Sequence, residues 1–200
     1  MIRRNRLLIP VSLPAKLLLT SSPEDYGYLK GTRKHIEGVD DRLEWNVLKE
    51  AFNVVGFTPE EQFNLCRIIA SILQVGNLEL ADDRSDQARI KNPQQIEKVC
   101  HVLGVPEQEF HNALLRPRVK AGREWVTQAR TRRQVIDEIA ALCNTMYEKA
   151  FSFLVDRINK ALDRPTSKSS FIGVLDIAGF EIFEVNSFEQ LCINYTNERL

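Results

Sequence analysis

The chain has 200 residues, 44% of them hydrophobic, and is therefore long enough to form one large domain with a buried core. Its 27 basic and 27 acidic residues balance, so the overall charge predicts binding neither to nucleic acid nor to a membrane surface. The four cysteines include no CxxC pair and the three histidines fall into no metal-ligand spacing, which indicates reduced cysteines in a cytosolic protein.

The N-terminal residues 1–16 are atypical. They contain basic and apolar side chains, but Pro10 and Pro14 interrupt any helix and no cleavage site of small residues is clear. We therefore expect no secretory signal, and no apolar run along the chain approaches the length of a membrane span. We interpret residues 1–16 as an alternative or mispredicted start, followed by a turn-rich loop from Ser21 to Gly38.

Start and stop signals mark two helices between residues 40 and 76. Asp40 or Asp41 caps the first, which is expected to run to about Val55 and to end at Gly56. The sequence Thr58-Pro59-Glu60-Glu61 is a capping box with proline at the first helical position, and it opens a helix that Gly76 ends. The apolar stripe of this second helix comprises Phe63, Cys66, Ile69, Ala70 and Leu73.

Short strands, short helices, an exposed hairpin and one long helix are expected next. They are strands at 78–80 and 88–90, helices from Asn92-Pro93 to Gly104 and from about Pro106 to Leu115, a hairpin or loop at 116–128 with Gly122 near its tip, and an amphipathic helix from about Arg133 to Leu162. A polar linker at 163–170 leads into the last part of the chain.

The stretch from Phe171 to Leu175 is an apolar run without strict alternation, which favours a strand buried on both faces of a central sheet. Asp176 ends that run, and Gly179 follows three residues later. A carboxylate at the end of a buried strand can hold a hydrated Mg²⁺, and a glycine exposes a backbone N–H for a phosphate oxygen. By itself the pair also fits ordinary turn chemistry, in which the aspartate caps and the glycine turns the chain.

After a short loop, Asn186-Ser187 opens a helix in which Ser187 and Gln190 have capping-box spacing. Its apolar stripe, Phe188, Leu191, Cys192 and Tyr195, is typical of a helix that packs in a core. The run Asp176-Ile-Ala-Gly-Phe-Glu181, followed by Asn186-Ser-Phe-Glu-Gln-Leu-Cys-Ile-Asn-Tyr-Thr-Asn-Glu198, resembles the switch II segment and the start of the relay helix of the myosin motor domain, most of all in class II myosins.

The resemblance implies definite roles for three residues. The aspartate that matches Asp176 lies near Mg²⁺ through water, and the glycine that matches Gly179 donates its N–H to the γ-phosphate. The glutamate that matches Glu181 pairs with an arginine of switch I, which closes the site and positions the attacking water. Gly179 and Glu181 are thus the expected catalytic residues, and Asp176 and Gly179 the expected contacts to Mg²⁺ and ATP.

The stretch from Arg116 to Arg133 holds seven basic residues and Glu124 as its one acid. A charge run of this kind is often only a solvated surface, but 117–126 resembles the cardiomyopathy loop with which myosins contact actin. The resemblance therefore implies an actin-binding role for Arg116, Arg118, Lys120, Arg123 and Glu124. The acid at Glu124 favours a permanently active loop, as in class II motors, over phosphorylation control.

The fold class that follows is mixed α/β and mainly helical: a fragment of the P-loop NTPase-like myosin motor head with one buried central-sheet strand. Residues 17–200 would form a partial motor domain, with an actin-contacting loop at 116–128, a strand and switch II at 171–181, and the start of the relay helix at 186–200. The chain ends at Leu200 inside a helix without a stop signal, as expected of a fragment.

Three functions remain open on these observations. The first is part of a cytoplasmic, cytoskeletal motor that uses ATP and Mg²⁺ and binds actin filaments. Light chains and a heavy-chain dimer are expected only in the full-length protein. Binding to nucleic acid or to a membrane is not expected. The sequence contains no Gly-x-x-x-x-Gly-Lys-Ser/Thr phosphate loop and no Asn-x-x-Ser-Ser-Arg run of switch I, so the chain alone is expected to be inactive. The alternatives are a non-enzymatic actin-binding fragment and another DxxG protein such as a small GTPase, although an Asn-Lys-x-Asp motif is absent.

Overall fold

The structure is a computed structural model that describes residues 12–20, 22–31, 36–163, 170 and 172–200. The chain divides into two compact units, Met1–Asp163 and Arg164–Leu200. Most of the segment 1–16 that is atypical in sequence therefore lies outside the described residues, as does most of the linker at 163–170.

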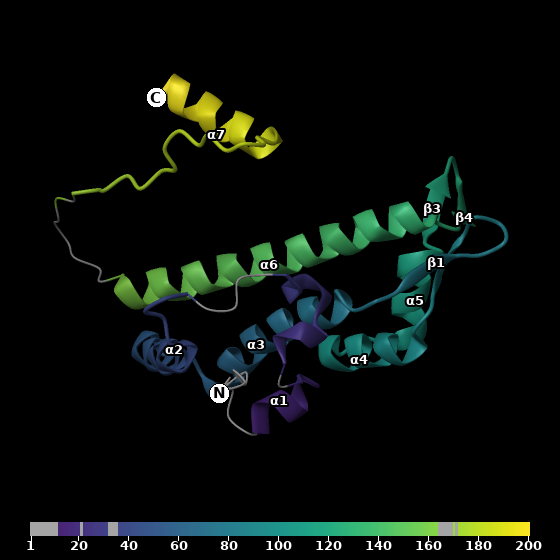
Figure 1. The fold of residues 1–200 in the computed structure, drawn as a ribbon, viewed down its shortest axis with the longest axis horizontal. Helices are drawn as coiled ribbons and strands as arrows, with labels where there is room; N and C mark the ends of the chain where they lie inside the picture. Colours follow the sequence, from purple (N-terminus) through teal and green to yellow (C-terminus); the bar gives the residue numbers. More distant parts are fainter. Residues whose placement is uncertain (1–11, 21, 32–35, 164–169, 171) are drawn as a thin grey trace. The chain divides into compact units, whose positions relative to one another are not determined.

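The first unit is mainly helical and carries two small antiparallel hairpins (Figure 1). Its elements in chain order are α1 (Ser12–Lys16), the 3-10 turns η1 (Pro23–Asp25) and η2 (Gly27–Leu29), α2 (Asp41–Val55), α3 (Pro59–Val75), β1 (Leu80–Asp82), β2 (Ala88–Ile90), α4 (Pro93–Leu103), α5 (Glu107–Leu115), β3 (Arg118–Ala121), β4 (Glu124–Thr127) and α6 (Arg132–Leu162).

The helix boundaries confirm the predicted caps. The side chain of Asp40 accepts a hydrogen bond from the backbone of Arg42, and Gly56 ends α2 in the left-handed conformation at φ 83°. Thr58 and Glu61 form the predicted capping box of α3. A further capping box, between Thr131 and Gln134, opens α6 and was not predicted.

Two local predictions need correction. The first strand begins at Leu80 rather than at residue 78, because the backbone N–H of Leu78 donates to the carbonyl of Val75 and continues the turn that ends α3. Ile69 is 42% exposed and so lies outside the buried face of α3. That face instead includes the polar Ser71 and Gln74, whose side chains both find backbone acceptors.

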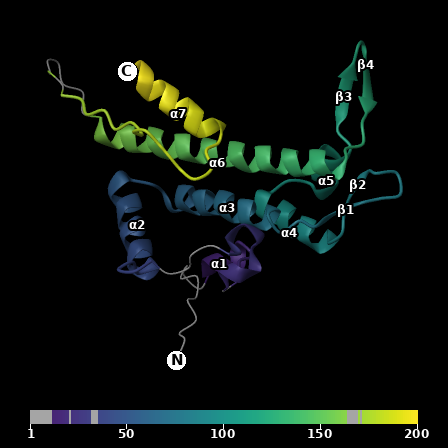
Figure 2. The same cartoon turned by 45° about the horizontal axis from the view of Figure 1, so that its top comes forward.

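The core of the first unit lies where α3, α4, α5 and α6 meet. In Figures 1 and 2, α6 runs alongside α3, and the two helices are in contact. The buried side chains are apolar or small and come from all four helices: Val75, Val99, Leu114, Leu115, Val135, Ile139 and Cys143. Burial raises the pKa of the Cys143 thiol above its ordinary value, as expected for a cysteine that packs as an apolar residue.

Arg157, near the C-terminal end of α6, joins this helix to the turn between α2 and α3. Its guanidinium donates to the carbonyl oxygen of Gly56 at 2.8 Å, lies 3.1 Å from a carboxylate oxygen of Glu61, and stacks 5.1 Å from the ring centroid of Phe57. Glu61 thus serves the capping box of α3 and the ion pair with α6 at once. The backbone N–H of Thr58 and, to a smaller degree, Arg157 hold the pKa of Glu61 below its ordinary value.

The second unit consists of an irregular segment followed by α7 (Phe188–Arg199). The predicted strand at 171–175 is not formed within its described residues: Ile172 to Leu175 pair with no other strand, and Phe171 lies outside the description. Ile172 and Val174 are 98% and 91% exposed. The physical reason is that a strand buried on both faces needs sheet neighbours, and the described residues supply none beside this segment.

Candidate functional site

The segment at 178–181, part of the predicted switch II, is held against α7 by side-chain amides. Asn194 binds the backbone of Glu181 twice: its Oδ1 accepts from the N–H of Glu181 at 2.8 Å and its Nδ2 donates to the carbonyl at 2.8 Å. Asn197 donates to the carbonyl oxygen of Ala178 at 2.8 Å. The Nε2 of Gln190 donates to the carboxylate of Glu181 at 3.3 Å. Four hydrogen bonds therefore join residues 178–181 to α7.

Gln190, Asn194 and Asn197 are spaced four and three residues apart, so they occupy one face of α7. We call this face the amide face. The sequence predicted the apolar stripe of the same helix and, for Gln190, only the capping box; the contacts of Gln190, Asn194 and Asn197 to residues 178–181 were not predicted. The i, i+4, i+7 spacing of three amides was the signal that could have revealed them.

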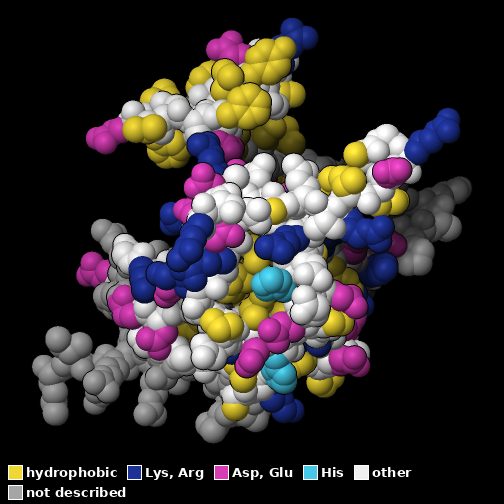
Figure 3. Space-filling view, turned by 90° about the vertical axis from the view of Figure 1, so that its right-hand side faces the viewer, with side chains coloured by type: hydrophobic (Ala, Val, Ile, Leu, Met, Phe, Trp, Pro, Cys, Tyr) yellow, Lys and Arg dark blue, Asp and Glu magenta, His cyan; other side chains and the backbone are white. Residues whose placement is uncertain are grey.

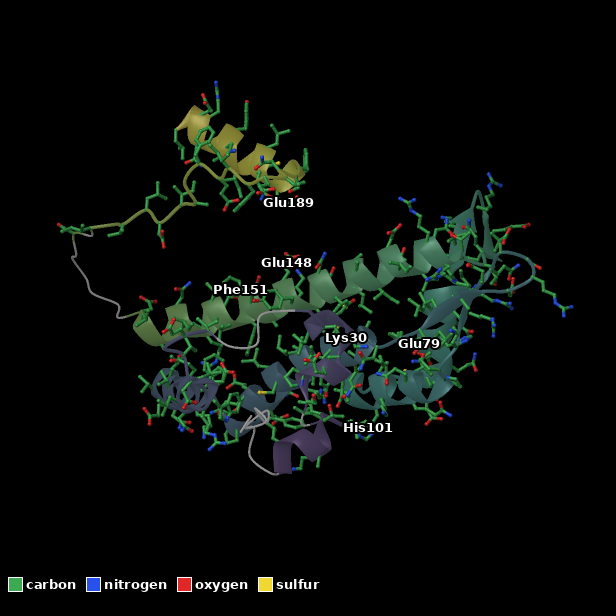
Figure 4. The ribbon with its side chains drawn as sticks, in the orientation of Figure 1. Lys30, Glu79, His101, Glu148, Phe151 and Glu189 are labelled. Atoms are coloured by element: carbon green, nitrogen blue, oxygen red, sulfur yellow. The ribbon has the colours of Figure 1, made fainter. Side chains whose placement is uncertain are left out.

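The N-terminal end of α7 carries the predicted capping box between Ser187 and Gln190. Asn186 closes the loop before it, accepting from the N–H of Phe183 at 3.0 Å and donating to its carbonyl oxygen at 2.9 Å. The hydroxyl of Ser187 also donates to the carboxylate of Glu189, which Figure 4 labels at the start of α7, and this bond holds the pKa of Glu189 below its ordinary value. An anionic side chain in the first turn stabilises a helix.

Asp176 and Gly179, the expected contacts to Mg²⁺ and phosphate, are both exposed. Among the described residues, an added Cβ at Gly179 would meet no atom within 4 Å. Within the described residues no group of three or more acidic, histidine or cysteine side chains could hold a metal. The donor types fit Mg²⁺ and a nucleotide phosphate, but one carboxylate and one amide are an incomplete set.

The apolar stripe of α7 is exposed to solvent. Phe188, Leu191 and Tyr195 are 74%, 63% and 64% exposed, and Cys192 is exposed as well. The predicted helix is formed and carries this stripe. Among the described residues, however, none covers the stripe.

The predicted hairpin at 116–128 is formed by β3 and β4, and its tip projects from the first unit in both ribbon views (Figures 1 and 2). Gly122 begins the two-residue turn at φ 64°, a conformation that favours glycine. Arg130 fixes the base, since its guanidinium donates to the carbonyl oxygens of Ala113 and Leu114 at 3.0 Å each, at the end of α5.

The strand register divides the expected actin-binding residues between the two faces of the hairpin. Arg118 is opposite Thr127 and Lys120 is opposite Trp125, so these four side chains share one face, which we call the basic face. Glu124 lies on the other face, paired with Ala121 and next to the pair Val119 and Val126.

Two other predicted contacts lie outside the strands. Arg116 lies at the base of the hairpin, 3.5 Å from the side-chain oxygen of Gln87, and Arg123 lies in the turn. Figure 3, which faces the hairpin end of the first unit, shows basic and acidic side chains interspersed. Positive charge on this side of the first unit is therefore not confined to the hairpin.

The chain matches the family model described as myosin head (motor domain) over residues 10–200. It is 52% identical to "Myosin type-2 heavy chain 1" of Schizosaccharomyces pombe over 189 residues, which are 94% of this chain and 12% of that protein. It is 50% identical to "Myosin type-2 heavy chain 2" of the same organism over 94% of this chain and 9% of that protein. To "Myosin heavy chain, non-muscle" of Drosophila melanogaster it is 42% identical over 88% of this chain and 9% of that protein.

The chain thus spans about a tenth of the length of the curated relatives it matches. Of the helices that the structure describes, none combines the length and hydrophobicity that crossing a lipid bilayer requires.

Proposed function

Since this chain belongs to the myosin motor-domain family and is similar to class II heavy chains, we propose that it is part of an actin-based cytoskeletal motor driven by Mg²⁺-ATP hydrolysis. Its contribution would be the segment that senses the nucleotide, the helix that follows that segment, and one contact to the filament. Light chains and a second heavy chain would join only in the full-length protein.

Three residues would serve the nucleotide site. Asp176 would hold a water ligand of the metal, and the N–H of Gly179 would bind the terminal phosphate. Glu181 would pair with a switch I arginine that these 200 residues do not contain. When bound, Mg²⁺ neutralises phosphate charge.

The observation that carries the proposal is the set of hydrogen bonds between the amide face of α7 and residues 178–181. A phosphate contact at Gly179 would shift the backbone between Ala178 and Glu181, and both of these residues are hydrogen-bonded to α7. Because a helix moves as a unit, a small displacement of this segment would reorient the whole of α7. The exposed apolar stripe would then be the surface through which α7 packs against other parts of the motor.

The hairpin would supply the filament contact. Arg118 and Lys120 project on its basic face, Arg123 lies at its turn, and all three are exposed. Exposed positive charge at an interface rim mainly accelerates association with an acidic surface.

A non-enzymatic actin-binding fragment is the second candidate. It is favoured by one observation: the hairpin and its anchoring at Arg130 are complete within the chain, whereas the nucleotide contacts are not.

Actin-activated ATPase activity of a motor domain completed with its phosphate loop and switch I tests the proposal. We expect phosphate release to accelerate when filaments are added. A completed motor that binds filaments but hydrolyses no ATP would favour the second candidate, and one that does neither would overturn both.

A further inference from the structure

Trp125 and Arg118 are diagonal neighbours on the basic face of the hairpin. Lys120 is directly opposite Trp125, and Arg118 is two residues from Lys120 on the same strand, which brings long side chains within reach of each other. The guanidinium carbon of Arg118 lies 5.9 Å from the centroid of the Trp125 ring. This distance is within the range of a cation–π interaction.

The contact has consequences for the mobility of Arg118. The hairpin projects from the unit, Arg118 is exposed, and the Trp125 side chain is 59% exposed, so both side chains lie largely in solvent. Arginine has a large rotamer entropy, which is lost when it binds a partner. A guanidinium already held against a rigid indole loses less of that entropy on binding.

The same face also presents the residue types that dominate protein interfaces. Arginine and tryptophan are enriched among residues whose truncation most weakens binding, and here they are adjacent. On the other face, Glu124 would repel an acidic partner, and its neighbours are aliphatic. Charge and composition therefore both favour the basic face as the one that meets an acidic protein surface.

We propose that Trp125 is a positioning residue: it holds the Arg118 guanidinium on the basic face of the hairpin in the orientation in which that face meets the acidic surface of an actin filament. This inference rests on the proposed function for the identity of the filament. The contact between Trp125 and Arg118 itself does not depend on it.

A double-mutant cycle in a completed motor domain tests the proposal. Filament dissociation constants are measured for Arg118→Gln, Trp125→Leu and the double variant. Arg118→Gln raises the filament dissociation constant by some factor in the unchanged protein. We expect this factor to be about two- to fivefold smaller in the Trp125→Leu background. Trp125→Phe, which keeps an aromatic face, should retain most of this coupling. The matched control is Glu124→Gln on the other face. Its change in the free energy of filament binding should add to that of Arg118→Gln without coupling.

Proton chemical shifts of Arg118 in the 200-residue chain provide a second readout that needs no filament. A side chain stacked on an indole is shifted upfield by the ring current, and this shift should disappear in Trp125→Leu and persist in Trp125→Phe. Shifts of Arg118 equal to those of a free arginine would overturn the proposal.

The two measurements separate this inference from the proposed function. If Arg118→Gln weakens filament binding but adds to Trp125→Leu without coupling, the positioning role is wrong and the hairpin contact stands. If Arg118 is shifted upfield but no variant of the basic face alters filament binding, the filament contact of the hairpin is wrong, and the positioning role falls with it.

Discussion

Gly27 and Gly179 show what single residues contribute to the two units. An added Cβ at Gly27 would lie 2.6 Å from the carbonyl oxygen of Gly76, so the close approach of η2 to the end of α3 requires glycine there. The same approach is fixed by Asn77, which accepts from the N–H of Gly27 at 2.7 Å and donates to the carbonyl of Asp25 at 2.7 Å. Gly179 has open space around it. No packing constraint from the described residues explains this glycine, which is consistent with a role toward a ligand.

We expect Gly27→Ala to destabilise the chain and Gly179→Ala to leave its stability unchanged. The obstacle at Gly27 is backbone rather than a flexible side chain, so the cost should be about 1–3 kcal/mol. At Gly179 the change should stay within about 0.5 kcal/mol. Denaturant unfolding of both variants checks this expectation, and equal midpoints would contradict it.

At Glu181 we expect alanine to spare nucleotide binding and to impair hydrolysis in a completed motor. The pair between Glu181 and the switch I arginine would form only when the site closes, so it would stabilise the transition state rather than bound ATP. Removing one partner of a buried pair costs about 3–5 kcal/mol, which corresponds to a loss of about two to four orders of magnitude in rate.

Rapid-quench measurement of the phosphate burst decides the role of Glu181. A normal burst in Glu181→Ala would mean that the pair is not what closes the site. A swapped pair, with arginine at position 181 and glutamate in switch I, should recover part of the rate.

At the scale of secondary structure, local signals predicted the elements well and missed their long-range contacts. The caps at Asp40, Thr58 and Ser187 follow from residues within one helical turn, and all three are formed. The strand at 171–175 depends on neighbours that lie elsewhere, and it is not formed in the described part of this segment. The amide face of α7 was missed for a related reason: asparagine has many uses, and only the folded segment shows which backbone groups it binds.

We expect Asn194→Ala to release the segment at 178–181 from α7. The variant loses both hydrogen bonds to the backbone of Glu181, each with a net value of about 1 kcal/mol. Hydrogen exchange at the amide of Glu181 should therefore accelerate by about five- to tenfold. Thr196→Ala is the matched control, because the hydroxyl of Thr196 donates to the carbonyl of Cys192 within the helix. Unchanged exchange in Asn194→Ala would show that the amide contact is not maintained in solution.

For the hairpin, we expect charge reversal at Arg118 and Lys120 to weaken filament binding while the ATPase rate without actin stays nearly the same. Both residues are exposed on the basic face, and rim charges act mainly on association rate and salt dependence. Cosedimentation with filaments over a range of salt concentrations is the measurement. Should binding and its salt dependence both be unaffected, the hairpin is only a solvated surface.

For the whole molecule, the two units differ in how much of their apolar surface they bury. The first unit has a core shared by α3 to α6, whereas no residue of α7 is buried and Ile182, Val185 and Phe188 are 81%, 86% and 74% exposed. Hydrophobic segments of this kind are stable only when other structure covers them. The first unit therefore accounts for most of the stability of this chain, whereas the second contains the residues proposed to serve the nucleotide site.

We expect the 200-residue chain by itself to show no ATP hydrolysis and no micromolar affinity for Mg²⁺-ATP. Nucleotide affinity in this class of proteins rests mainly on a phosphate loop whose backbone N–H groups and lysine surround the phosphates, and the sequence contains no such motif. Asp176 and Gly179 are exposed, so water competes for both, and two contacts do not offset the loss of nucleotide freedom on binding. Calorimetric titration with Mg²⁺-ATP measures this directly, with a completed motor as the positive control. A saturating transition in the micromolar range for the chain alone would mean that residues outside Asp176 and Gly179 form a nucleotide site of their own.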